Sequence, residues 1–241
     1  MSSRKRIDQQ PAYVVHAQPW RETSLVLDVF SRDFGRVGLV ARGARRPYSA
    51  LRGVLMSFQP LLLDWSGGGE LKNLVRAEWR GGQPLPSGRA LLYGYYLNEL
   101  LLRLLAREDP HPRLFDAYCE ALAALVAGAP AMILLRRFEL ALLRELGYAV
   151  ALEIEAATGV PIRAEADYIY VPDNGARPVH EVPAATGVRV SGRTLLDLAR
   201  DDFSCAQTVT ESAVLLRMII HHHLGGRPLQ SRRVLKELHE L

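Results

Sequence analysis

The hydrophobic pattern of the chain changes once, near residue 83, and this change limits what the two parts can fold into. Up to about residue 80, apolar residues form short runs separated by turn residues, as in β-strands. Beyond residue 88 they recur at helical spacing over long segments. Between the two parts, Gln83–Gly88 contains prolines and a glycine that interrupt either pattern. The sequence therefore predicts an α+β chain with one domain at residues 1–82 and a second at residues 83–241.

The first domain is expected to be a small barrel. Gly35 ends a short hairpin connection that needs a positive φ, and the glycine-rich run Ser66–Glu70 predicts a looser hairpin. Five short strands without a long helix between them favour a five-stranded OB-fold, with an SH3-like barrel as the alternative. The predicted strands, all rich in β-branched, aromatic and leucine residues, are Ala12–Gln18, Ser24–Phe30, Val37–Ala41, Leu55–Trp65 and Leu71–Trp79.

The second domain is expected to be mainly helical. Val150–Val190 loses the helical period and carries glycine and proline throughout, so we expect an irregular insert with short strands at about residues 150–190. Thr208, with Glu211 three residues later, has the pattern of a capping box at the start of a helix. The predicted helices are Ala90–Arg107, Pro112–Ala127, Ala131–Leu146, Thr194–Asp201, Thr208–Leu224 and Pro228–Glu240.

Charge is distributed unevenly along the chain. Residues 1–80 hold 13 Lys/Arg and 7 Asp/Glu, a net of +6, whereas the remainder holds 17 and 19, a net of −2, which together give the +4 of the whole chain. A basic first part indicates a polyanionic partner. From charge alone, a solvated arginine-rich surface is an equally good explanation.

Membrane and secreted classes are not favoured. The longest stretch without a charge, residues 121–135, is interrupted by Gly128 and Pro130 and is shorter than the ~20 residues that span a bilayer. The basic N-terminal residues are not followed by the apolar segment of a signal peptide. Cys119 and Cys205 are expected to be reduced thiols. We therefore expect a cytoplasmic protein without membrane contact.

The most informative segment is residues 35–52, where a predicted strand leads into a flexible Gly-Ala turn. Arginines supply the phosphate contacts that release counterions, and a tyrosine can stack on a base. Three arginines within five residues, without an acidic residue, favour DNA binding over a merely solvated loop. The candidate DNA-binding side chains of this segment are Arg36, Arg42, Arg45, Arg46, Tyr48 and Arg52.

The triple glycine Gly67–Gly69 is better explained as a hairpin loop than as a phosphate-binding loop. It lacks the Lys-Ser/Thr ending of a P-loop and the third glycine of a dinucleotide-binding motif. Trp65 precedes it, Lys72 and Arg76 follow it, and we expect all three to border the same DNA-binding face.

The three consecutive histidines at residues 221–223 are not expected to bind a metal. Adjacent helical residues point about 100° apart, and no cysteine or carboxylate follows within the next helical turn. A cluster at a helix C-terminus, interacting with the helix dipole, is the expected role. No hydrolase or metalloprotease motif occurs, so we expect no catalytic site, no cofactor and no metal.

Arg136 and Arg137 lie beside an apolar helical stripe that includes Leu140 and Leu143. Most such stripes belong to a core. Because adjacent residues cannot both face inward, one arginine must reach solvent, where it can pair with an acidic peptide whose apolar side chain enters a groove.

Several segments together resemble the RecO family, and their order runs through nearly the whole chain. No single motif is specific, whereas the order and spacing are. The segments that carry the resemblance are Ala12–His16, Arg21–Ser24, Gly35–Arg36, Ala41–Arg46, Leu51–Gly53, Leu134–Glu139, Leu146–Tyr148 and Ser231–Leu235.

This resemblance implies an N-terminal OB-fold, a central helical bundle and a small irregular insert. It implies binding of single- and double-stranded DNA, annealing of complementary strands and, together with RecR, loading of RecA onto DNA coated by the single-stranded-DNA-binding protein SSB, in the cytoplasm at the nucleoid. Docking on the acidic C-terminal tail of SSB is also implied, which strengthens the hypothesis for Arg136 and Arg137. Many family members carry a four-cysteine zinc cluster in the insert, but residues 150–190 contain no cysteine here, so no zinc is expected.

The mechanism predicted from these residues is physical rather than chemical. The basic segment holds the phosphates of one strand and Arg232 and Arg233 hold another, so that charge neutralisation lets complementary strands pair. Two other classes stay open. One is a metal-dependent nuclease using Asp28, Glu70 or Glu78, and the other is an RNA-binding OB module.

Overall fold

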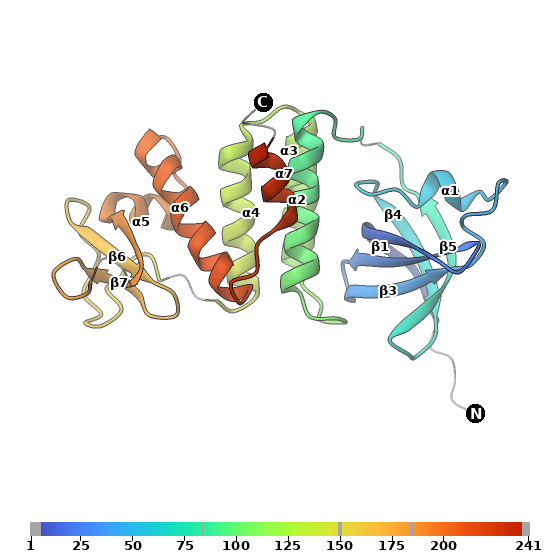
Figure 1. The fold of residues 1–241 in the computed structure, drawn as a ribbon, viewed down its shortest axis with the longest axis horizontal. Helices are drawn as coiled ribbons and strands as arrows, with labels where there is room; N and C mark the ends of the chain where they lie inside the picture. Colours follow the sequence, from blue (N-terminus) through green and yellow to red (C-terminus); the bar gives the residue numbers. More distant parts are fainter. Residues whose placement is uncertain (1–5, 83, 149–150, 184–185, 238–241) are drawn as a thin grey trace. The chain divides into compact units, whose positions relative to one another are not determined.

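The computed structural model describes residues 6–82, 84–148, 151–183 and 186–237. Three predictions touch residues outside these ranges: the boundary residue Gln83, the first insert residue Val150 and the end of the last helix up to Glu240. The chain forms two compact units, of which the second is residues 130–228. The first unit joins the part up to Ala129 with the part from Leu229 onwards, so it contains both the barrel and later helices (Figure 1). The domain boundary predicted at residues 82–83 is not tested by this division and stays a prediction.

A closed five-stranded barrel begins the first unit and confirms the predicted OB-like fold (Figure 1). Its strands follow the order β1-β2-β3-β5-β4, with β3 and β5 parallel and the other pairs antiparallel. The strands are β1 (Arg6–Trp20), β2 (Ser24–Ser31), β3 (Gly35–Ala41), β4 (Leu61–Ser66) and β5 (Leu71–Trp79). A short helix, α1 (Leu51–Val54), precedes β4, so the strand predicted from Leu55 begins only at Leu61.

Alternate residues of the strands fill the barrel. Leu27 of β2, Leu39 of β3 and Leu63 of β4 are fully buried, as is the larger Trp65 two residues further along β4. The expectation that Trp65 borders the DNA-binding face is therefore wrong, because its side chain is part of the barrel core. Side chains two residues apart share one face of a strand, so these strands present an apolar face inward. Ala44, beyond the end of β3, belongs to the same apolar cluster, so its burial anchors the segment after β3 to the barrel core.

Three helices complete the first unit: α2 (Arg89–Leu104), α3 (Pro112–Val126) and α7 (Gln230–Glu237). Glu99 of α2 holds the start of α7, because its carboxylate accepts hydrogen bonds from the backbone N–H groups of Gln230 and Ser231, both at 2.9 Å. The Ser231 hydroxyl donates to the same carboxylate at 2.6 Å. The first backbone N–H groups of a helix have no partner within the helix, and Glu99 supplies their acceptor. These bonds attach α7 to the first unit, although residues 130–228 separate the two in the sequence.

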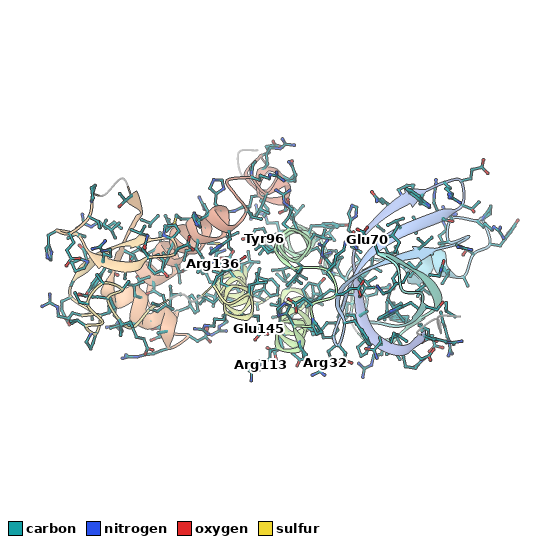
Figure 2. All side chains as sticks on the ribbon, turned by 90° about the horizontal axis from the view of Figure 1, so that it is seen from below. Arg32, Glu70, Tyr96, Arg113, Arg136 and Glu145 are labelled. Carbon is teal, nitrogen blue, oxygen red and sulfur yellow. The ribbon has the colours of Figure 1, made fainter. Side chains whose placement is uncertain are left out.

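The outer surface of β1 and β2 is covered by α3. The rings of Tyr13 and Phe30 pack on Phe115, with centroids 5.7 Å and 5.4 Å away. At the edge of this contact, Arg32, which is labelled in Figure 2, pairs with Asp116 at 3.1 Å. This face of the barrel is therefore part of the core of the first unit and is not open to a ligand.

The second unit contains α4 (Ala131–Glu145), α5 (Gly192–Ala199) and α6 (Ala206–His223). A three-stranded antiparallel sheet of order β7-β6-β8 confirms the predicted insert with short strands: β6 (Asp167–Val171), β7 (Gly175–Pro178) and β8 (Val188–Ser191). Among the described helices, none combines the length and apolar composition needed to cross a membrane.

The predicted capping box at Thr208 is wrong. Helix α6 begins at Ala206, two residues before Thr208. The Thr208 hydroxyl donates to Asp197 at 2.7 Å, and Glu211 accepts from the backbone N–H of Ser191 at 2.9 Å. Both side chains thus bind residues of α5 and its N-cap, and their partners are found only in the folded chain.

Candidate nucleic-acid interface

The loop between β3 and α1, residues 42–50, is held in place by backbone contacts. Its Ala44 is 1% exposed in the barrel core. The backbone N–H of Arg45 donates to the carbonyl of Thr23 at 2.9 Å, and that of Arg46 donates to Gly43 at 3.1 Å. Gly43 has a φ of +70°, a conformation that glycine adopts without strain. The loop can therefore present its arginines from a defined backbone.

The same loop is joined to the β1–β2 turn, residues 21–23. The Arg45 guanidinium donates to the carbonyl oxygens of Arg21 at 3.4 Å and Glu22 at 3.3 Å. At this end of the barrel Leu25 pairs with Ala41, so the turn and the loop leave the sheet side by side. Arg45 is thus both a surface cation and a link between two segments.

Exposed basic and aromatic side chains gather on these segments. No described acidic side chain lies within ion-pairing distance of Arg42, Arg46 or Arg52. Tyr48 is fully exposed, so its ring face is open to a base. The structure therefore brings together five of the predicted DNA-binding residues, from Arg42 to Arg52.

Two further residues of this site escaped the sequence reasoning. Trp20, the last residue of β1, is 44% exposed, and Arg21 follows it in the turn. Arg21 has a φ of +52°, which costs a non-glycine residue roughly 1–3 kcal/mol and is often tolerated at functional positions. The signal in the sequence was a tryptophan and an arginine next to a turn. We call the combined set the turn–loop surface: Trp20, Arg21, Arg42, Arg45, Arg46, Tyr48 and Arg52.

Arg36 and Lys72 lie elsewhere and are engaged in ion pairs. Arg36 on β3 shares Asp28 with Arg107, at 3.5 Å and 3.1 Å respectively. Burial lowers the pKa of Arg36, and Asp28 opposes that shift. Lys72 is largely buried and pairs with Glu108. These cations attach the barrel to the segment after α2, and their role in DNA binding stays a prediction.

The remaining predicted DNA-binding residues lie on elements other than those that form the turn–loop surface. Arg76 is exposed on β5 and pairs with Glu78. Arg232 and Arg233 lie on α7, which contacts α2, and Arg233 pairs with Glu237 at 3.8 Å. Their assignment as a second strand-binding patch stays a prediction.

The predicted peptide groove on α4 is largely filled in the structure. Arg136, which is labelled in Figure 2, is 5% exposed and pairs with the buried Glu139. Arg137 is exposed and pairs with Asp201 at 2.9 Å. Leu140 and Leu143 are 3% and 0% exposed, so neither offers an open apolar surface. Of this predicted set, Arg137 alone has a side chain that a peptide can reach. Binding of the SSB tail at this face stays a prediction.

The chain begins with a closed OB-like barrel, which is followed by helices and a small sheet. Arginines and aromatic side chains gather at one end of the barrel. These features define an α+β protein of the OB-barrel class. Residues 5–82 match the family model for the N-terminal part of recombination protein O, and residues 85–233 match the model for its C-terminal part. The chain therefore belongs to the RecO family.

Similar proteins cover the whole chain. A protein of Aromatoleum aromaticum is 63% identical over 242 residues, and one of an Azoarcus species is 58% identical over 244 residues, in each case over 100% of both chains. A protein of Ralstonia nicotianae is 50% identical over 98% of this chain and 86% of its own length. All three are named DNA repair protein RecO.

Proposed function

We propose that the chain is a non-enzymatic recombination mediator in DNA repair. It binds single- and double-stranded DNA through the turn–loop surface, anneals complementary strands and, with RecR, helps RecA to load onto SSB-coated single-stranded DNA, in the cytoplasm at the nucleoid. Membership of the RecO family supports the role in DNA repair and recombination. The observation that carries DNA binding is the charge of the turn–loop surface. Its two segments, residues 20–23 and 42–52, contain five arginines and one acidic residue, Glu22, together with two exposed aromatic rings.

Binding at this surface is proposed to be independent of base sequence. Arginines on a backbone-anchored loop contact phosphates and release counterions, which gives affinity without base readout. Trp20 and Tyr48 add stacking, which every base can provide. Neutralised phosphates repel a second strand less, so a complementary strand can pair while the first is held. Arg232 and Arg233 on α7 are the proposed second contact.

The carboxylates that a nuclease would use are engaged with arginines. Asp28 forms ion pairs with Arg36 and Arg107, Glu78 pairs with Arg76, and Glu70 lies 3.8 Å from Arg107. In a two-metal nuclease site the carboxylates converge on metal ions, not on arginine side chains. This arrangement supports a mediator without hydrolytic activity.

The proposed contact with the acidic SSB tail is limited to the exposed part of α4. Arg137 can exchange Asp201 for a carboxylate of the tail, because both partners of that ion pair are more than half exposed. Its guanidinium also lies 5.7 Å from the ring centroid of Phe203. An aromatic side chain of the tail would have to use an apolar surface other than Leu140 and Leu143.

Annealing and cleavage assays on the full chain test the proposal. Complementary oligonucleotides, bare or coated with SSB, should pair faster with the protein than without it, and labelled strands should stay intact in Mg²⁺ or Mn²⁺. Metal-dependent cleavage by a pure preparation would replace the mediator with a nuclease. Much tighter binding of structured RNA than of single-stranded DNA would favour an RNA-binding module.

A further inference from the structure

The β6–β7 turn and the last turn of α6 bring three metal-ligating side chains together in the second unit. Asp173 lies in the β6–β7 turn, and His222 and His223 end the helix. One ligand atom from each lies within 4.8 Å of those of the other two. The expectation that the histidine run binds no metal rested on neighbours in sequence, whereas Asp173 precedes His222 by 49 positions.

The distances are close to those of a metal site. Nε2 of His222 lies 2.6 Å from Oδ2 of Asp173. Two ligands about 2.0–2.1 Å from a tetrahedral zinc ion are about 3.3 Å apart, so opening this contact by less than about 1 Å admits the ion. The two histidines diverge from the helix axis, yet their ring centroids are only 5.3 Å apart. Rotation of the exposed Asp173 and His222 side chains can therefore bring their ligand atoms to one point beside the His223 ring.

The surroundings of His223 suit a ligand. Its ring stacks on Tyr148 at a centroid distance of 3.6 Å and an angle of 11°, which fixes the ring plane. Groups that orient a ligand in this way strengthen metal binding.

Water can reach the remaining coordination position. The side chains of Asp173 and His222 are 62% and 46% exposed. His222 also lines an open pocket of about 540 Å³ together with Pro172, Gly187 and Met218. A site with three protein ligands and a solvent ligand is a common zinc arrangement, and nitrogen and carboxylate oxygen are ligands that zinc accepts.

We propose that Asp173, His222 and His223 bind one zinc ion, with water as the fourth ligand. The ion fixes the β6–β7 turn to the C-terminal end of α6, so that the small sheet and the helix unfold together. This proposal is independent of DNA binding, because all three ligands belong to the second unit.

Zinc titration of the full, untagged chain, freed of metal beforehand, tests the site. Competition with a chromogenic chelator should give one zinc per chain, and free zinc at 100 times the dissociation constant should raise the melting temperature by roughly 5–10 °C. Uptake well below one zinc per chain at micromolar zinc overturns the proposal and leaves the His222–Asp173 contact as an ordinary hydrogen bond.

Single substitutions identify the ligands. Asp173→Asn keeps a residue type that tolerates the φ of +62° at this position, but removes the carboxylate, and it should weaken zinc binding about tenfold or more. His222→Ala should do the same. The matched control is His221→Ala, which removes a histidine of the same helical turn that is outside the set and should leave zinc affinity unchanged. Wild-type affinity in Asp173→Asn, or an equal loss in His221→Ala, overturns the assignment.

Discussion

Removing Arg42 and Arg46 together should flatten the salt dependence of DNA binding without unfolding the barrel. Both side chains are exposed and lack a described acidic partner, while the loop is held by Ala44 and by backbone hydrogen bonds. Each phosphate contact contributes about 0.7 to the slope of log K against log salt for single strands. Contacts from all five arginines of the turn–loop surface predict a slope of about −3.5, and three contacts predict about −2.1. Arg45 is left in place because it also joins the loop to the turn.

Fluorescence anisotropy with a labelled single-stranded oligonucleotide measures both slopes. Between 50 and 200 mM salt, wild-type affinity should fall about 130-fold and that of the Arg42→Ala/Arg46→Ala variant about 18-fold. The control Arg189→Ala/Arg217→Ala removes the same charge from exposed positions of the second unit and should keep the wild-type slope. An unchanged slope in the loop variant, or an equal change in the control, would refute the assignment of these phosphate contacts.

Four further substitutions test the stability of the fold, and the first of them also tests DNA binding. Arg21→Gly should raise the free energy of unfolding by about 1 kcal/mol, because glycine adopts a φ of +52° without strain, yet weaken binding to single strands; wild-type binding would remove Arg21 from the surface. Arg136→Ala should cost about 3–5 kcal/mol in denaturant titrations, because it removes the arginine that pairs with the buried Glu139, whereas Arg137→Ala should cost about 0–1 kcal/mol; equal losses would contradict the two burial states. Glu99→Ala should lower the free energy that holds α7 in place by about 1–3 kcal/mol, because the N–H groups of Gln230 and Ser231 lose their acceptor. Limited proteolysis should then cleave α7 faster, and an unchanged cleavage rate would show that Glu99 does not hold the helix.

Elements set by local pattern were predictable from the sequence. β5 has the predicted bounds Leu71–Trp79, because turn residues on both sides limit it. The hairpin glycine Gly35 has the expected positive φ, +63°. The fold adds a constraint that no local pattern contains: a Cβ at this position would lie 1.9 Å from the carbonyl oxygen of Asp109. Short α1 was missed, since four residues carry too little periodic signal.

The basic loop was predictable as a candidate site because it is charged, local and free of acidic residues. The same reasoning included Arg36 and Lys72 with the DNA-binding residues, although the fold pairs Arg36 with Asp28 and Lys72 with Glu108. Glu108 lies 36 positions from Lys72, so the pairing depends on a tertiary contact. The sequence predicts which charged side chains are exposed only where their neighbours in space are also their neighbours in the sequence.

The return of α7 to the first unit orders events during synthesis of the chain. The ribosome must produce residues 130–228 before the residues of α7 exist, which takes about 5–20 s at typical elongation rates. During that interval the barrel can close, because its apolar cluster extends no further than Ala77. Glu99 on α2, in contrast, lacks these two partners until Gln230 and Ser231 have been synthesised. A nascent chain arrested after residue 228 should therefore have a protease-resistant barrel and a loosely held α2.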